Sequence, residues 1–165
     1  MFHPTILLVS ALVFIASAAA SLSTAAHAAE CKVVQGHLNE TLVTGPTCTS
    51  PVGLCTVARM FGALQGEAQF TASAIMQSAD TPTTSVVFVI GDTVIVDAKL
   101  AGHRGTLTVK NAAAFRTTGN GDLADVQTVT GGTEDFAGAT GSLRISGNFV
   151  ETTGSSAYKG VVCLP

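Results

Sequence analysis

The sequence has 165 residues, of which 47% are hydrophobic and only 12% are charged. Eight basic and eleven acidic residues give a net charge of −3, and no basic cluster occurs, so a nucleic-acid partner is not predicted. Tryptophan is absent and there is one tyrosine, which also disfavours a sugar or nucleic-acid site built on stacking against aromatic rings. The length suits one domain.

The first segment has the pattern of an export signal. Ile6 to Ala20 is an apolar run shorter than the roughly 20 residues that span a bilayer. Ala26-His27-Ala28 has small residues at the two positions that a signal peptidase reads, which predicts cleavage before Ala29. The first four residues lack Lys and Arg, so a retained anchor is the alternative. We predict a signal peptide over 1–28 and one domain over 29–165, secreted or periplasmic and free of the membrane after cleavage.

Four cysteines follow that segment: Cys31, Cys48, Cys55 and Cys163. An even number in a small exported chain predicts two disulfides. Cys48 and Cys55 flank a loop that carries Pro and Gly, which favours their pairing with each other and leaves Cys31 to pair with Cys163. A four-thiolate metal site would need closer cysteine pairs, so no metal is predicted.

Four segments alternate between apolar and polar residues, as strands with one dry and one wet face do. They are Val33 to Val43, Glu67 to Gln77, Arg104 to Lys110 and Ser142 to Glu151. Their predicted inward residues are Val34, Leu38 and Leu42, then Ala68, Phe70, Ala72, Ala74 and Met76, then Leu107 and Val109, and finally Leu143, Ile145 and Phe149. Tyr158 to Leu164 supplies a last strand.

One residue breaks this alternation. Glu40 shares the parity of Leu38 and Leu42 in the first strand. If that face is internal, a carboxyl group lies in an apolar interior, its pKa rises, and it can act as an acid or a base. The alternative is that the strand end frays near Gly45-Pro46 and Glu40 is solvated.

Val86 to Leu100 differs from the alternating segments, because Val86 to Ile90 and Val94 to Val96 are continuously apolar. The segment predicts either a hairpin or one long bulged strand. In both cases we expect it to be buried on both faces, with a partner subunit as one cover.

Motifs for catalysis are scarce. No nucleophile elbow, zinc-binding helix motif or phosphate-binding loop occurs. His37 and His103 are expected at the surface. Asp122 and Asp125 form a candidate carboxylate pair, but they follow the turn at Thr118 to Gly121 and we expect them to be solvated.

Gly131 to Gly141 reads Gly-Gly-Thr-Glu-Asp-Phe-Ala-Gly-Ala-Thr-Gly, a tight connection whose single aromatic, Phe136, can plug the end of a β-structure. With Gly105 to Lys110, Phe115 and Leu143 to Gly147 in the same order, it resembles the signature of the allene oxide cyclase-like barrel superfamily, which includes the dirigent proteins. The resemblance implies an all-β fold, an antiparallel up-and-down eight-stranded barrel, and favours a homo-oligomer such as a trimer.

Three functions are compatible with this resemblance. The first is binding of a small apolar molecule in the barrel lumen, in a dirigent-like manner. The second is a cofactor-free cyclase or isomerase acting on a lipophilic substrate, with Glu40 as the candidate catalytic residue. The third is a structural or interaction protein stabilised by its disulfides. The absence of an acid, base and nucleophile set favours a non-enzyme, and no cofactor is predicted.

The predicted ligand-binding residues face the lumen near Glu40. Alanines alternate there with larger apolar side chains, which leaves space for one ligand in a small barrel. The set is Leu38, Glu40, Phe70, Leu107 and Phe149, with Ala68 and Ala72 beside them.

Overall fold

The computed structural model describes residues 29–78 and 85–165. The predicted signal peptide over 1–28 lies outside the described residues. Within the described part, none of the helical segments has the length and hydropathy needed to cross a bilayer.

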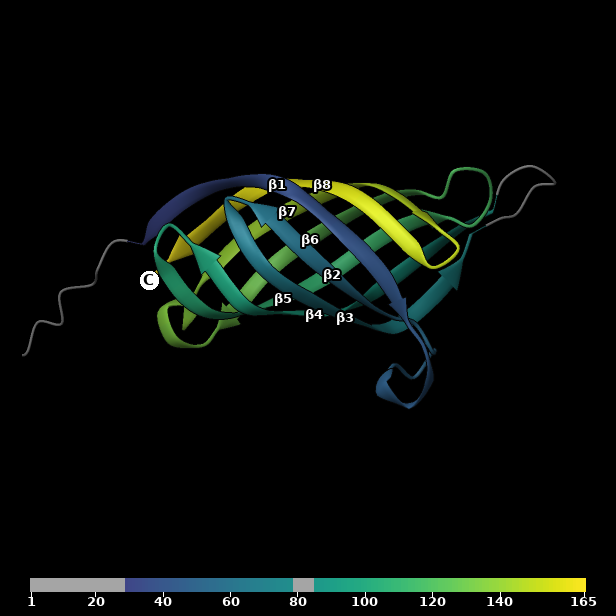
Figure 1. Cartoon of the computed structure of the whole chain (residues 1–165), viewed down its shortest axis with the longest axis horizontal. Helices are drawn as coiled ribbons and strands as arrows, with labels where there is room; N and C mark the ends of the chain where they lie inside the picture. The colour runs from purple at the N-terminus through teal and green to yellow at the C-terminus, as the bar shows by residue number, and fades with distance from the viewer. Residues whose placement is uncertain (1–28, 79–84) are drawn as a thin grey trace, which may run out of the picture.

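Eight antiparallel strands form a closed barrel in which each strand pairs with the next in the chain and the last returns to the first (Figure 1). The strands are β1 Glu30–Val43, β2 Cys55–Gly62, β3 Leu64–Gln77, β4 Val86–Leu100, β5 His103–Arg116, β6 Asp122–Gly132, β7 Thr140–Val150 and β8 Thr153–Leu164. Helix in the described part is limited to two short 3-10 turns, η1 Gly45–Thr47 and η2 Glu134–Phe136. The predicted fold class is therefore confirmed. Closure leaves no unpaired sheet edge.

One end of the barrel is packed solid. Side chains from most strands meet there and are fully or almost fully buried: Val34, Leu64, Leu100, Leu107, Leu143, Tyr158, Val162 and Leu164. The Tyr158 hydroxyl accepts a hydrogen bond from the Leu64 amide at 2.9 Å and donates one to its carbonyl at 2.7 Å. The described chain begins and ends at this end (Figure 1).

Phe136 closes the packed end, as the sequence predicts. Its side chain is 0% exposed and lies in η2, between β6 and β7. A Cβ atom on Gly132 would come within 2.8 Å of the Phe136 Cβ and 2.0 Å of the Thr106 carbonyl oxygen, so glycine is required where the connection leaves β6.

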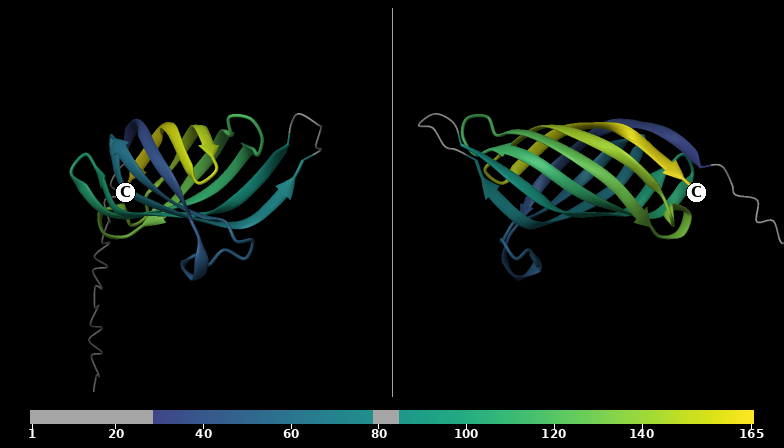
Figure 2. Two further views of the ribbon diagram at one scale, coloured as in Figure 1. Left: turned by 45° about the vertical axis from the view of Figure 1, so that its right-hand side comes forward. Right: turned by 180° about the vertical axis from the view of Figure 1, so that it is seen from behind.

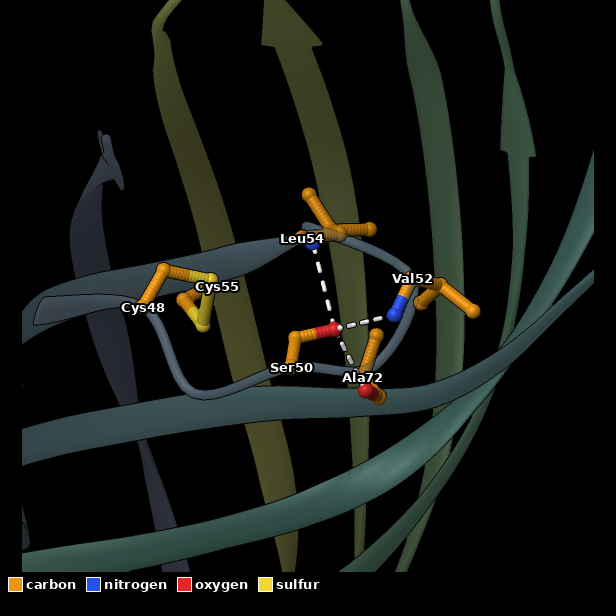
Figure 3. The surroundings of a disulfide bond; sticks show 6 residues. All are labelled: Cys48, Ser50, Val52, Leu54, Cys55 and Ala72. Atoms are coloured by element: carbon orange, nitrogen blue, oxygen red, sulfur yellow. Dashed lines mark hydrogen bonds between the residues drawn. A yellow bond between two sulfur atoms is a disulfide. The ribbon is translucent and has the colours of Figure 1, made fainter. Parts of the chain in front are cut away.

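Both predicted disulfides are confirmed, Cys31–Cys163 and Cys48–Cys55. Cys31 and Cys163 are opposite each other in the β1–β8 ladder, so the bond joins the first strand to the last. The Cys48–Cys55 loop is further held by Ser50, whose hydroxyl donates to the Ala72 carbonyl at 2.6 Å and accepts from the Val52 and Leu54 amides at 3.2 Å (Figure 3). The loop is thus fixed to β3.

β4 is one long strand with a register shift between Ile95 and Ala98, which settles the choice between a hairpin and a bulged strand. The prediction that it is buried on both faces is wrong for the single chain. Phe88, Ile90 and Val94 are exposed, because they point outward while Val89, Thr93 and Ile95 point inward. The continuous apolar run therefore gives the barrel an apolar outer surface.

A register shift also corrects the predicted inner face of β3. The pairing with β4 is irregular between Ala72 and Ala74, and the extra residue inverts the alternation beyond it. Ala72 is 0% exposed, as predicted, but Met76 is 52% exposed and pairs with the outward Phe88. Ala74 and Met76 thus belong to the outer face.

Candidate functional site

The lumen contains a cavity of about 140 Å³ toward the end opposite the Phe136 plug. Leu54 in the β1–β2 connection, Phe115 at the end of β5 and Phe149 at the end of β7 lie at this end. Figure 2 shows the β1–β2, β5–β6 and β7–β8 connections at this end of the barrel. The lining is mainly apolar: Leu38, Leu54, Ala58, Met60, Ala68, Phe70, Val89, Ile95, Ala113, Phe115, Leu123, Ile145 and Phe149, with the polar residues Glu40, Thr56, Thr93, Asn111, Asp125 and Gln127 among them.

Four of the five residues predicted to bind a ligand line this cavity, namely Leu38, Glu40, Phe70 and Phe149. Leu107 does not. It is 0% exposed and belongs to the packed end of the barrel, so its inclusion is corrected. Of the two neighbouring alanines, Ala68 lines the cavity and Ala72 is buried without lining it.

Glu40 points into the lumen from β1 and is half-buried, which corresponds to the internal alternative rather than the solvated one. Its carboxylate accepts a hydrogen bond from the Thr56 hydroxyl of the neighbouring strand β2. Burial raises the pKa of the Glu40 carboxyl, the Thr56 hydrogen bond opposes that rise, and the charge of Asp125 adds to it.

Asp125 lies inside the barrel and is only 7% exposed, so the expectation that it is solvated is wrong. One carboxylate oxygen, Oδ2, accepts hydrogen bonds from Gln127 Nε2 at 2.7 Å and Asn111 Nδ2 at 2.9 Å. Asn111 Oδ1 in turn accepts a hydrogen bond from the Thr93 hydroxyl at 3.0 Å. Burial raises the pKa of Asp125, and the hydrogen bonds from Gln127, Asn111 and the backbone work in the opposite direction. Asp122, the other member of the candidate pair, is exposed and ion-paired with Arg116 at 3.4 Å.

The two lumen carboxyl groups line the same cavity from strands that are not neighbours, β1 and β6, and the charge of Asp125 contributes to raising the pKa of Glu40. Among the described residues that line the cavity, these two are the only ones that ionise. The cavity is therefore an apolar space with an uncompensated acidic pair.

Two phenylalanines lie nearer the open end of the barrel than Asp125 does. Phe115 and Phe149 pack edge to face with ring centroids 6.1 Å apart, and both are half-buried. Asp125 pairs with Ala113, one inward position before Phe115 on β5. A ligand that enters from this end meets aromatic rings first and carboxylates beyond them.

Sequence reasoning missed the polar cluster of Thr56, Thr93, Asn111, Asp125 and Gln127. For Asp125 and Gln127 a signal was present, since both share the parity of Leu123 and Val129 in β6. The opposite parity also mixes apolar and polar residues, with Ala124 and Val126 among Asp122, Thr128 and Thr130. Alternation alone therefore does not decide which face of β6 is internal.

The first prediction concerns Asp125 and pH. A folded-state pKa above the unfolded one means that the folded chain holds the proton more tightly. The tighter binding of this proton by the folded chain contributes stability that is present in acid and is lost as pH rises through the folded-state pKa of Asp125. Asp125→Asn should remove that loss, so the variant should be more stable than the wild type at about pH 7 and should differ less from it near the unfolded carboxyl pKa of about 3.9.

Thermal unfolding between these pH values measures the difference. Glu40 lines the same cavity as Asp125 and is present in both proteins, so its titration is common to them. The charged residues on the adjacent strands, Lys110 and Arg144, are exposed on the outer face and do not line the cavity. Asp122→Asn, on the same strand but exposed, is the matched control and should leave the pH dependence unchanged. A destabilised Asp125→Asn protein at neutral pH would contradict the account.

Among the described residues, no group of three or more His, Cys, Asp or Glu side chains is arranged to hold a metal ion. The chemistry that the cavity itself offers is hydrogen bonding and proton transfer by two carboxyl groups in an apolar surround.

Fold and cavity together define a small closed eight-stranded β-barrel with an acidic, ligand-sized lumen. No family model matches the chain, and no curated protein matches it. A solved structure of a protein of unknown function from the DUF3224 family of Shewanella oneidensis MR-1 is 19% identical, with a TM-score of 0.51, covering 82% of this chain and 98% of the other. The pterocarpan synthase dirigent protein GePTS1 is 10% identical, with a TM-score of 0.35, covering 83% of this chain and 86% of the other. The first likeness shows the barrel fold alone, and the second is too weak to carry an argument.

Proposed function

We propose that the protein binds a small apolar molecule in the barrel lumen and does not transform it. The observation that supports this most strongly is the cavity of about 140 Å³ beside a fully packed barrel end. Natural cores are packed to near crystal density, so an unfilled apolar space of this size in a small barrel is unusual. A cavity of about 150 Å³ lined by Leu, Ile and Phe is large enough to bind benzene.

Toluene tests this proposal, because one substituted ring suits the cavity volume. Titration calorimetry of the wild-type protein should give saturable binding. Ala68→Phe fills the cavity with its own ring and should weaken toluene binding at least about tenfold, a loss of roughly 1.4 kcal/mol. Unchanged binding in this variant would contradict a lumen site.

Gln69→Phe is the matched control, since Gln69 is the next residue of β3 and is exposed on the outer face. It should bind toluene within about twofold of the wild type, a difference below about 0.5 kcal/mol. If Ala68→Phe does not fold, Ala113→Phe fills the same cavity from β5.

The alternative is a cofactor-free cyclase or isomerase, and one observation favours it. Two carboxyl groups with raised pKa values share the cavity, and a carboxyl group whose pKa is raised by burial is a candidate for proton transfer. Glu40→Gln separates the two functions. A binder keeps its affinity for an apolar probe, whereas an acid–base catalyst keeps binding and loses turnover.

Self-association is a further part of the proposal. Two rows of outward side chains cross β3 to β6 without a charge: Met76, Phe88, Ala114 and Ala124, then Ala74, Ile90, Ala112 and Val126. Beside them Asp92 and Lys110 form an ion pair within the chain, so the edge of the patch carries no unpaired charge from these two residues. We therefore favour a homo-oligomer, with a trimer expected from the family resemblance.

Light scattering at micromolar concentration should give a multiple of the chain mass for the wild type. Phe88→Lys with Ile90→Lys should give the single-chain mass, because each substitution introduces a charge into the apolar patch. A single-chain mass for the wild type would contradict self-association.

The proposed location is outside the cytoplasm, in the periplasm or the medium. Two disulfides and no free cysteine among the described residues are typical of oxidising compartments. If the lumen takes no ligand, a structural or interaction role for the disulfide-bonded barrel is the remaining function.

A further inference from the structure

Two buried side-chain atoms in the described part of the chain have no hydrogen-bond partner, Ser156 Oγ on β8 and Asp125 Oδ1, and of these two residues only Asp125 lines the cavity. Asp125 Oδ1 is buried and has no hydrogen-bond partner in the described part of the chain, whereas Oδ2 of the same carboxyl accepts two hydrogen bonds. A buried acceptor without a donor costs roughly 1–3 kcal/mol, and more if it is charged. Buried polar groups are normally paired, so an exception inside a cavity points to a ligand group.

The required ligand group is a hydrogen-bond donor. The hydrogen bonds around Asp125 all run toward its carboxylate, from Asn111, Gln127 and the backbone, and Glu40 likewise accepts from Thr56. The polar side chains that line the described cavity include no Lys, Arg or His. Two acidic groups therefore face one apolar space without a cation.

A cation with an apolar body would satisfy these features together. Its charge would offset the repulsion between the two carboxylates, and its N–H groups would donate hydrogen bonds to the carboxyl groups that line the cavity. Phe70, Phe115 and Phe149 line the same cavity, and aromatic faces attract both rings and cations. A neutral alcohol could donate one hydrogen bond but would bring no charge to offset that of the carboxyl groups.

We propose that the lumen is selective for a small lipophilic amine, bound with its ammonium group at the carboxyl groups of Asp125 and Glu40 and its apolar body against the aromatic residues toward the open end. This inference rests on the proposed lumen-binding function and names the chemical class of its ligand. The ammonium forms charge-assisted hydrogen bonds, which are stronger than neutral ones.

Three probes of nearly equal size separate the contributions: benzylamine, benzyl alcohol and toluene. Titration calorimetry at about pH 7.5, where benzylamine is protonated, should give the tightest binding for benzylamine, by at least about tenfold over benzyl alcohol. Asp125→Asn should weaken benzylamine binding by about tenfold or more and change toluene binding by less than about threefold.

Asp122→Asn is the control, since it removes an equal charge from an exposed position on the same strand. It should leave all three affinities unchanged, which distinguishes a contact in the lumen from a general effect of net charge. Thermal unfolding checks that both variants are folded.

The outcomes separate this inference from the function on which it rests. If toluene or benzyl alcohol binds as tightly as benzylamine, the lumen binds neutral molecules and the amine assignment is wrong while the proposed function stands. If benzylamine binds equally well to wild type and Asp125→Asn, the assignment is also wrong. If none of the three probes binds, both the assignment and the proposed function fail.

Discussion

Replacing Cys31 and Cys163 by Ser together should cost about 5 kcal/mol of unfolding free energy, because the bond closes a loop with a sequence separation of 132. The cross-link restricts the unfolded chain, and the restriction grows with the length of the closed loop. For a domain of this size the loss corresponds to a melting temperature lower by on the order of 15 °C.

The Cys48→Ser, Cys55→Ser protein is the matched comparison. Its loop has a sequence separation of 7, and the expected cost is about 2.5 kcal/mol. Denaturant unfolding of both proteins at one pH measures the difference. Equal losses, or a larger loss for the short loop, would show that the bond between β1 and β8 does not act mainly on the unfolded chain.

Phe136→Ala should be the most damaging single truncation in the core, at about 3–5 kcal/mol. The ring is 0% exposed and packs between Gly132 and the side chains of the closed end, so its removal leaves a void that the rigid barrel cannot fill. Urea unfolding provides the measurement.

Phe61→Ala is the comparison for this effect. Phe61 lies on the outer surface, 38% exposed and stacked on His37 with ring centroids 5.0 Å apart. Its loss should cost less than about 1 kcal/mol, as is usual for exposed positions. Similar costs for the two variants would mean that Phe136 is not the plug of the barrel end.

The strand pattern and the cysteine pairing could be predicted from the sequence because each depends on local information. Alternation of side chains is a property of a single strand, and the Cys48–Cys55 loop selects its own pair. The register shift between Ala72 and Ala74 depends on the pairing of β3 with β4 and leaves no mark in the alternation. Alternation alone therefore places Met76 on the inner face, whereas the side chain lies on the outer face.

Part of the candidate site could also be predicted, where a residue departs from the alternation of its own strand. Glu40 is recognisable because a charged residue interrupts an apolar face of β1. Asp125 gives a weaker signal, because polar and apolar residues occur on both faces of β6 and the exposed Val126 lies on the outer one. Which section of the lumen stays open depends on side-chain volumes from all eight strands, and this is why Leu107 packs in the closed end while Phe149 lines the cavity.

The central claim is that the open section of the lumen holds a small molecule in the native protein. The most direct measurement is organic extraction of protein purified without organic additives, followed by mass spectrometry, with Ala68→Phe prepared in parallel. The account predicts a low-molecular-weight compound in near-stoichiometric amount from the wild type and little or none from Ala68→Phe, whose added ring occupies the cavity. Equal recovery from both proteins, or an empty wild-type barrel that also fails to bind toluene, would contradict it.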